Sequence, residues 1–238
     1  MTTLQDLLIY KKIAGGGGGG EAVLITKNIT ANGTYNASSD NADGYSQVTV
    51  NVPDRASQLV DQTISGEIVI PEGVTTIRPS LFSGCTQLTS VQMPSTLTRI
   101  QEYGFANTTS LKSIDLSNIQ SLNQYSFLSS GIETVDASNI SYLANGVFQN
   151  CASLKTVKIG AISPIPTSTF KNCSNMEYFD FTLFGVVGST VGTSLGNVDA
   201  FNNTNNAPMI FATQEIMQVY AAATNWSTYA SRMTYVGA

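Results

Sequence analysis

The chain has 238 residues and a formal net charge of −5, and only 11% of its residues are charged. This balance leaves no basic surface for nucleic acid. The absence of histidine excludes histidine-based catalytic triads, cysteine–histidine nucleophiles and histidine-ligated zinc. No apolar run approaches the roughly 18 residues of a membrane-spanning helix, so we expect no membrane partner. We also predict neither a cofactor nor a metal site.

Residues 1–14 are predicted to form an anchoring helix. The i, i+3, i+4, i+7 spacing that places side chains on one helical face is found at Leu4, Leu7, Leu8 and Lys11. A helix this short does not persist alone in water, so it needs another copy or another protein to pack against. A frayed terminus is the alternative. Six glycines follow at 15–20, and we interpret them as a flexible linker.

Residues 21–53 are predicted to be a small antiparallel β-hairpin module. The segment 46–52 alternates apolar and polar residues as a strand does, and 22–29 does so more loosely. A few strands this short are marginal alone, so the module is expected to pack on a neighbour or on other copies of itself.

A period of about 22 residues dominates the chain from Pro71 to Phe181. Its marker is a phenylalanine, with successive spacings of 23, 22, 21 and 22 residues. The five are Phe82, Phe105, Phe127, Phe148 and Phe170. Apolar residues recur eight and five positions before each of them, and a small residue recurs three positions after. A Leu-rich pattern with a fixed period of 20–29 residues predicts a leucine-rich solenoid.

The solenoid is predicted to occupy residues 54–212, with its units stacked so that each column packs on itself. The expected strands of its parallel sheet are Leu88–Met93, Leu111–Leu116, Ile132–Ala137, Leu154–Ile159 and Met176–Phe181. A degenerate last unit is expected to begin at Phe201 and to end in a strand at 209–211. Residues 213–238 are predicted to form a helical cap, with Trp226 and Tyr229 sealing the end.

The three cysteines fall in one column of the repeat, at Cys85, Cys151 and Cys173. We expect small, buried, free thiols in a turn. A disulfide between Cys151 and Cys173 is conceivable because their units are adjacent, but an odd number of cysteines argues against it.

The repeat resembles a known family. The stretch IPEGVTTIRPSLFSGCTQLTSVQMPSTLTRI, residues 70–100, is similar to the BspA-type leucine-rich repeat, although Thr108 and Ser130 replace its usual cysteine. The ending at 207–233 is similar to the terminal cap of such proteins in bacteria and prophages. ITANGTYNASSDNADGYSQVTVNVP, residues 29–53, resembles a module of phage structural proteins. The resemblance implies a mainly β solenoid and a surface-displayed binding protein without catalytic residues.

The outward columns of the predicted sheet form the candidate ligand-binding face. These residues are Ser90, Gln92, Ser113, Asp115, Thr134, Asp136, Thr156, Lys158, Tyr178 and Asp180. Polar rows with one aromatic residue favour a weak, repeated ligand such as a host-surface glycan or protein, bound through multivalency. A plain solvated face is the alternative. Asp115 and Asp136 are expected on adjacent rungs, about 5 Å apart, which is the spacing of a retaining glycosidase, but an open ladder provides no pocket.

Three functions remain open at this stage. The first is a phage virion protein of a tail, baseplate or capsid that is held by the N-terminal helix to other virion proteins, as a monomer or a homotrimer. The second is a bacterial cell-surface adhesin, although the first 20 residues do not resemble a secretion signal because Lys11 and Lys12 follow the apolar residues. The third, a glycan-hydrolysing enzyme, depends only on the aspartate pair, and we do not expect an enzyme.

Overall fold

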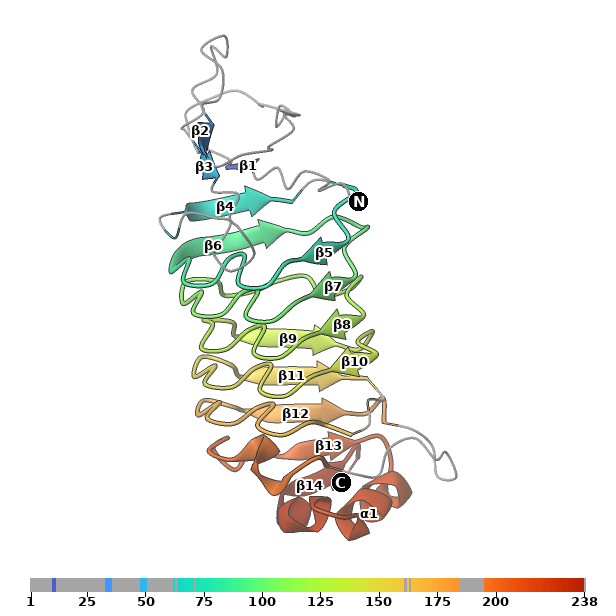
Figure 1. The fold of residues 1–238 in the computed structure, drawn as a ribbon. Coiled ribbons are helices and arrows are strands. Elements are labelled where there is room, and N and C mark those ends of the chain that lie inside the picture. The colour runs from blue at the N-terminus through green and yellow to red at the C-terminus, as the bar shows by residue number, and fades with distance from the viewer. Residues whose placement is uncertain are drawn as a thin grey trace.

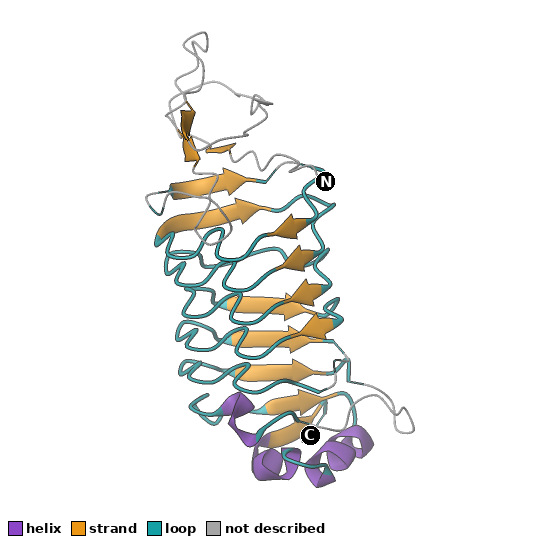
Figure 2. Cartoon of the chain, viewed as in Figure 1, coloured by secondary structure: helices purple, strands orange, loops and turns teal. Residues whose placement is uncertain are grey.

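The computed structural model describes residues 10–11, 33–35, 48–50, 62, 64–70, 72–160, 162, 164–184 and 195–237. The described residues from 64 to 237 form a single stack of short rungs that is closed at its C-terminal end by helices (Figure 1). The stack has two β walls with a continuous apolar core between them (Figure 2).

The first wall is the parallel sheet that the repeat predicts. Its strands are β4 (Ser65–Val69), β6 (Gln87–Gln92), β9 (Thr134–Ala137), β11 (Thr156–Ile159), β12 (Tyr178–Phe181), β13 (Met209–Phe211) and β14 (Met233–Tyr235). β4 pairs with β6, and the last five strands pair in the order β9–β11–β12–β13–β14. Matching positions lie opposite one another, so Val135, Val157 and Phe179 form one buried row.

The second wall consists of two-residue strands, β5 (Thr76–Ile77), β7 (Arg99–Ile100), β8 (Ser121–Leu122) and β10 (Tyr142–Leu143). They pair in parallel and in register in the order β5–β7–β8–β10. The second residue of each strand is buried, and it is the apolar residue five positions before the phenylalanine. This wall is therefore the one that the upstream apolar columns predict.

The phenylalanines form a single file along the stack, which confirms the central prediction from the repeat. Phe82 and Phe105 stack with ring centroids 4.9 Å apart, and the next three steps, to Phe127, Phe148 and Phe170, measure 5.5, 5.6 and 5.6 Å. A sixth ring, Phe201, continues the file at 5.6 Å. All six side chains are buried.

Backbone hydrogen bonds join the rungs along the same file. The N–H of Phe105 donates to the carbonyl of Ser126 at 2.7 Å, and the N–H of Phe127 donates to that of Val147 at 3.0 Å. The chain turns with a positive φ two positions before and two positions after each of the first five phenylalanines, for example at Tyr125 and Ser129. These two turns bring each amide next to the following rung, so the side of the stack between the two walls is also hydrogen-bonded.

One predicted strand is absent. Residues 111–116 form no strand, and the sheet is interrupted between β6 and β9. The N–H of Glu133 still donates to the carbonyl of Lys112 at 2.9 Å. Ile114 is only partly buried, whereas its counterpart Val135 is buried. The prediction of a strand at 111–116 was therefore wrong.

Uneven unit lengths provide the physical reason. The unit before this segment is one residue longer than the period, and the following unit lacks one residue between Ser130 and Ile132. The shortened turn brings Gly131 against the backbone of the preceding rung, where its N–H donates to the Thr108 carbonyl at 3.0 Å. A Cβ on Gly131 would lie 2.0 Å from the carbonyl oxygen of Thr109. Only glycine permits this approach.

The C-terminal cap agrees with its prediction in most respects. It consists of η1 (Val198–Phe201), α1 (Gln214–Ala222) and η2 (Trp226–Arg232), and the Thr213 side chain accepts from the N–H of Ile216 to begin α1. Trp226 and Tyr229 are buried, and the indole meets Phe181 edge-on at 5.6 Å. The return of the chain after η2 to add β14 beside β13 was not predicted.

The N-terminal predictions fall mostly outside the described residues, including Leu4, Leu7 and Leu8. At Tyr10–Lys11 the chain forms strand β1, which pairs antiparallel with β4, so the helix prediction is wrong at Lys11. The helix spacing did not account for a β edge, which offers backbone partners to a passing segment. In the predicted hairpin module, β2 (Gly33–Tyr35) pairs antiparallel with β3 (Val48–Val50), while 22–29 lies outside the described residues.

Substitution of Gly131 tests the explanation of the interrupted sheet. We expect Gly131→Ala to lower the free energy of unfolding by at least about 3 kcal/mol, because a methyl group there meets backbone that cannot rotate away. Gly73→Ala is the control, since its Cβ meets nothing within 4 Å and only its positive φ is strained, at about 1–2 kcal/mol. Urea denaturation measures both. Equal losses would contradict the close approach at Gly131.

Candidate functional site

None of the ten candidate ligand-binding residues is buried, and eight of them lie on strands β6, β9, β11 and β12 of the first wall. They alternate with buried residues of the same strands, as Thr134 and Asp136 do with Val135. The side chains therefore point away from the core.

The candidate residues of β9, β11 and β12 form two cross-strand rows. Thr134, Thr156 and Tyr178 lie opposite one another in the first row. Asp136, Lys158 and Asp180 lie opposite one another in the second, so a cation separates two carboxylates. Opposite charges in directly paired positions stabilise a sheet by a few tenths of a kcal/mol, roughly. The outcome is a flat polar surface of alternating charge.

A third row of charges runs beside these two. The Glu133 carboxylate lies 3.7 Å from the Lys112 ammonium and 3.3 Å from that of Lys155. All three side chains are exposed, so the pairs add little to stability. Their effect is to neutralise charge along the face.

Ser113 and Asp115 lie in the segment 111–116 that forms no strand. No strand pairing joins Asp115 to Asp136, so the structure gives no support to the close carboxylate pair that the repeat predicted.

The aspartates of the face instead cap turns at the ends of the rungs. Asp115 accepts from the N–H of Ser117 at 2.9 Å. Asp136 accepts from the N–H of Ser138 at 2.9 Å and also from its hydroxyl. Asp180 accepts from the N–H and hydroxyl of Thr182 at 2.9 and 2.6 Å. The sequence carries this signal as Asp-x-Ser/Thr, which is an Asx-turn pattern that recurs with the repeat. The prediction of the face did not include these turns.

The turn determines the ionisation of Asp136. The Ser138 hydroxyl lowers the pKa of the Asp136 carboxyl below its ordinary value of 3.8, assisted by the Ser138 N–H and by the nearby Lys158, while partial burial opposes the shift. A general acid of a glycosidase needs a raised pKa. The direction of this shift is therefore the opposite of what a general acid at Asp136 would need.

The three cysteines are buried thiols outside any disulfide, as predicted. Burial raises the pKa of the Cys151 thiol to about 11. Its Sγ donates to the carbonyl of Phe127 at 3.0 Å, and the Sγ of Cys173 donates to that of Phe148 at 3.1 Å. Thr108 and Thr204, in the same column, donate to Phe105 and Phe201 in the same way as hydroxyls, within their own units. The column thus supplies small donors for a buried turn.

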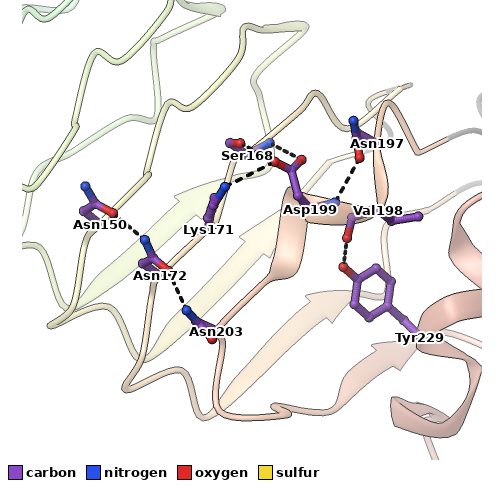
Figure 3. Close-up of polar contacts among 9 residues, drawn as sticks. All are labelled: Asn150, Ser168, Lys171, Asn172, Asn197, Val198, Asp199, Asn203 and Tyr229. Carbon is purple, nitrogen blue, oxygen red and sulfur yellow. Dashed lines mark hydrogen bonds and ion pairs between the residues drawn. The ribbon is translucent and has the colours of Figure 1, made fainter.

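A polar ladder on the turns beside the phenylalanine file was missed by the sequence analysis. Asn203 donates through its side-chain amide to the oxygen of Asn172, which donates to that of Asn150, each at 2.8 Å (Figure 3). All three have positive φ, which asparagine tolerates better than most residues. They stand two positions after the phenylalanine, and that spacing was the available signal.

A second polar cluster joins the last repeat to the cap (Figure 3). Asp199 accepts from the Ser168 hydroxyl at 2.8 Å and lies 3.5 Å from the Lys171 ammonium. The Tyr229 hydroxyl donates to the carbonyl of Val198. These contacts fix η1 and η2 against the stack, and none involves a candidate ligand-binding residue.

A groove of about 660 Å³ lies in the cap, and none of the ten candidate residues lines it. It is lined by Asn206, Pro208, Thr228, Tyr229, Ser231, Arg232, Met233 and Thr234. The Arg232 guanidinium donates to the carbonyl of Ala207 through Nε at 3.0 Å and through Nη2 at 2.8 Å. Burial lowers the pKa of Arg232. The guanidinium is therefore used as a clamp between η2 and the preceding loop.

Within the described part of the chain, no helix has the length and apolarity to cross a membrane. The same residues contain no group of three cysteine, aspartate or glutamate side chains arranged to hold a metal ion.

Comparison with known proteins identifies the repeat. Residues 61–177 match the BspA type leucine rich repeat region in six copies. No curated protein matches the chain.

Several solved structures are similar. A leucine-rich repeat protein of T. pallidum is 24% identical (TM-score 0.47) over 48% of this chain and 55% of its own. A leucine-rich repeat protein from Bacteroides ovatus is 21% identical, with a TM-score of 0.47, over 50% of this chain and 31% of its own. The pneumococcal vaccine antigen PcpA is 15% identical, with a TM-score of 0.55, over 75% of this chain and 42% of its own. The likeness to PcpA supports the same fold, and the chain spans only about a third to a half of these proteins' lengths.

The turn at Asp136 provides a pH test. A lowered folded-state pKa stabilises the protein above about pH 4, and this contribution is lost as the pH falls through the folded pKa. We expect Ser138→Ala to raise the pKa of Asp136 toward 3.8 in an NMR titration, and its cost in unfolding free energy to shrink below about pH 4. Ser141→Ala is the control, because that hydroxyl donates to the carbonyl of Gln120 and to no carboxylate. An unchanged pKa in Ser138→Ala would contradict the assignment.

Proposed function

Because residues 61–177 match the BspA type leucine rich repeat region, we propose that this chain is a surface-displayed binding protein whose solenoid adheres to a host-cell surface. The adhesive surface is the outer face of the first wall. The observation that carries the proposal is the two rows of outward side chains on β9, β11 and β12, which repeat from rung to rung.

The chemistry of these rows favours a glycan or a polar protein surface. Hydroxyl groups of Thr134 and Thr156, the half-exposed Lys158 and the carboxylates beside it offer both donors and acceptors at about 4.8 Å intervals. Tyr178, 39% exposed, adds one aromatic surface. A shallow face of this kind binds weakly at each contact, and several copies on one particle, for instance a homotrimer, convert weak contacts into firm attachment.

We further propose that the display occurs on a phage virion. The support is the resemblance of residues 29–53 to a module of phage structural proteins, and the 1–14 segment would then connect the chain to other virion proteins. A bacterial cell surface is the alternative. The two placements differ in an observable way: antibody labelling of purified particles supports the virion, and labelling of uninduced host cells supports the cell surface.

The binding face is tested with whole cells. Fluorescently labelled protein is expected to bind one or more members of a panel of Gram-positive and gut bacteria, and the double variant Lys158→Ala, Tyr178→Ser is expected to reduce bound fluorescence by about tenfold or more, as for central contacts of an interface. Tyr142→Ser is the control, since Tyr142 is 55% exposed on the second wall. A double variant that binds as well as the control would exclude the first wall as the adhesive face.

A further inference from the structure

Two tyrosines form an exposed stack at the corner that follows the second wall. Tyr103 and Tyr125 have ring centroids 5.2 Å apart and an interplanar angle of 30°. They occupy the same position of successive units, two residues before the phenylalanine. Neither belongs to the candidate face on the first wall, so the stack has no role in the proposed function.

The backbone does not require tyrosine at this position. The column has positive φ in every repeat from Ser80 to Ser168, and its other members are serine or glycine. A bulky side chain with positive φ is an outlier that costs about 1–3 kcal/mol and is most often found at functional sites. Two adjacent outliers, of which Tyr103 is exposed and Tyr125 is partly buried, therefore point to a use for the rings.

One face of the stack is open. At the C-terminal side the Tyr125 ring lies over Gly146, where a Cβ would come within 2.3 Å of the ring. At the N-terminal side the neighbour of Tyr103 in the column is Ser80, whose N–H donates to the Glu102 carbonyl at 2.8 Å. A serine is too small to cover a phenol ring. Tyr103 is accordingly 39% exposed, and Tyr125 is the one described ring that stacks on it.

Two arginines lie close by, Arg78 in the unit before Tyr103 and Arg99 in the unit of Tyr103 itself. Arg78 directly follows β5, and the Gln101 N–H donates to the Ile77 carbonyl at 2.9 Å, which places Arg78 beside the turn that leads to Tyr103. Arg99 is in β7 on the same wall and pairs with Thr76. Both are exposed, and neither forms an ion pair with a described residue.

The local acid does not neutralise them. Glu102 accepts from the side-chain amide of Asn123 at 3.1 Å. Its carboxylate is therefore directed toward the following unit, whereas Arg78 lies in the preceding unit. By contrast, Lys112, Lys155 and Lys171 are each paired with a carboxylate. The corner is thus a local basic and aromatic surface on a chain with a net charge of −5.

We propose that Tyr103, Tyr125, Arg78 and Arg99 form a second binding site, specific for an acidic saccharide. The apolar face of one sugar ring packs on the open ring of Tyr103, because aromatic rings offer a rigid contact surface at low entropic cost. A carboxylate on that sugar or the next one accepts from the guanidinium groups, whose planar donors match a carboxylate. This site lies on a different wall from the adhesive face and does not depend on it.

Polygalacturonate is a suitable probe because every ring of it carries both an apolar face and a carboxylate. The full-length protein is expected to bind it in affinity electrophoresis at least about tenfold more tightly than neutral dextran, with affinity falling as salt rises. Tyr103→Ser is expected to weaken binding by about tenfold or more. It should fold normally, because serine occupies this column in two other units. Arg78→Gln is expected to weaken binding and to reduce its salt dependence.

Tyr142→Ser is the matched control. Tyr142 is 55% exposed, and serine occupies the paired position at Ser121, but it belongs to neither proposed binding site. Its binding to polygalacturonate is expected to equal that of the wild type. The proposal is overturned if polygalacturonate does not bind, if dextran binds equally well, or if Tyr142→Ser weakens binding while Tyr103→Ser does not. Cell adhesion of Tyr103→Ser, measured separately, reports on the first wall alone.

Discussion

Every rung of this protein is fixed to the next at its phenylalanine. The ring stacks on the ring of the following unit, and the N–H of the same residue donates to the carbonyl that precedes the next phenylalanine. One position therefore supplies both the apolar contact and a backbone hydrogen bond between units. Since a solenoid unit contacts only its neighbours, the sum of such steps determines stability along the stack.

The same constraint explains where the structure departs from regularity. A unit that lacks one residue must still place Phe127 and Phe148 in the file, and it does so at 5.6 Å. The difference is absorbed in the turn at Gly131 and in the loss of strand pairing at 111–116. The file is kept while the sheet gives way, which indicates that the core contact outweighs a few sheet hydrogen bonds in this region.

The sequence was informative where a signal recurs at the period. The apolar columns predicted both walls, the phenylalanine file and the buried cysteines, because stacking makes every inward position repeat. Asx turns at Asp136 and the asparagine ladder also recur, but polar columns were interpreted only as exposed surface. Strand β14 follows the cap helices and is not part of the repeat, so the period could not predict it. The outward direction of the ten candidate residues followed from strand alternation, whereas their ligand depends on a partner that no spacing encodes.

The rigid core holds the shape of the molecule, and the exposed faces are proposed to bind. Both depend on the phenylalanine file. The most direct measurement is the unfolding free energy of Phe127→Ala, with Thr134→Ala, on the exposed face of the neighbouring strand, as the reference. The account predicts a loss of about 3–5 kcal/mol for Phe127→Ala, as for other buried phenylalanines, and a loss under about 0.5 kcal/mol for the reference. Equal and small losses in the two variants would contradict the claim that the file holds the stack together.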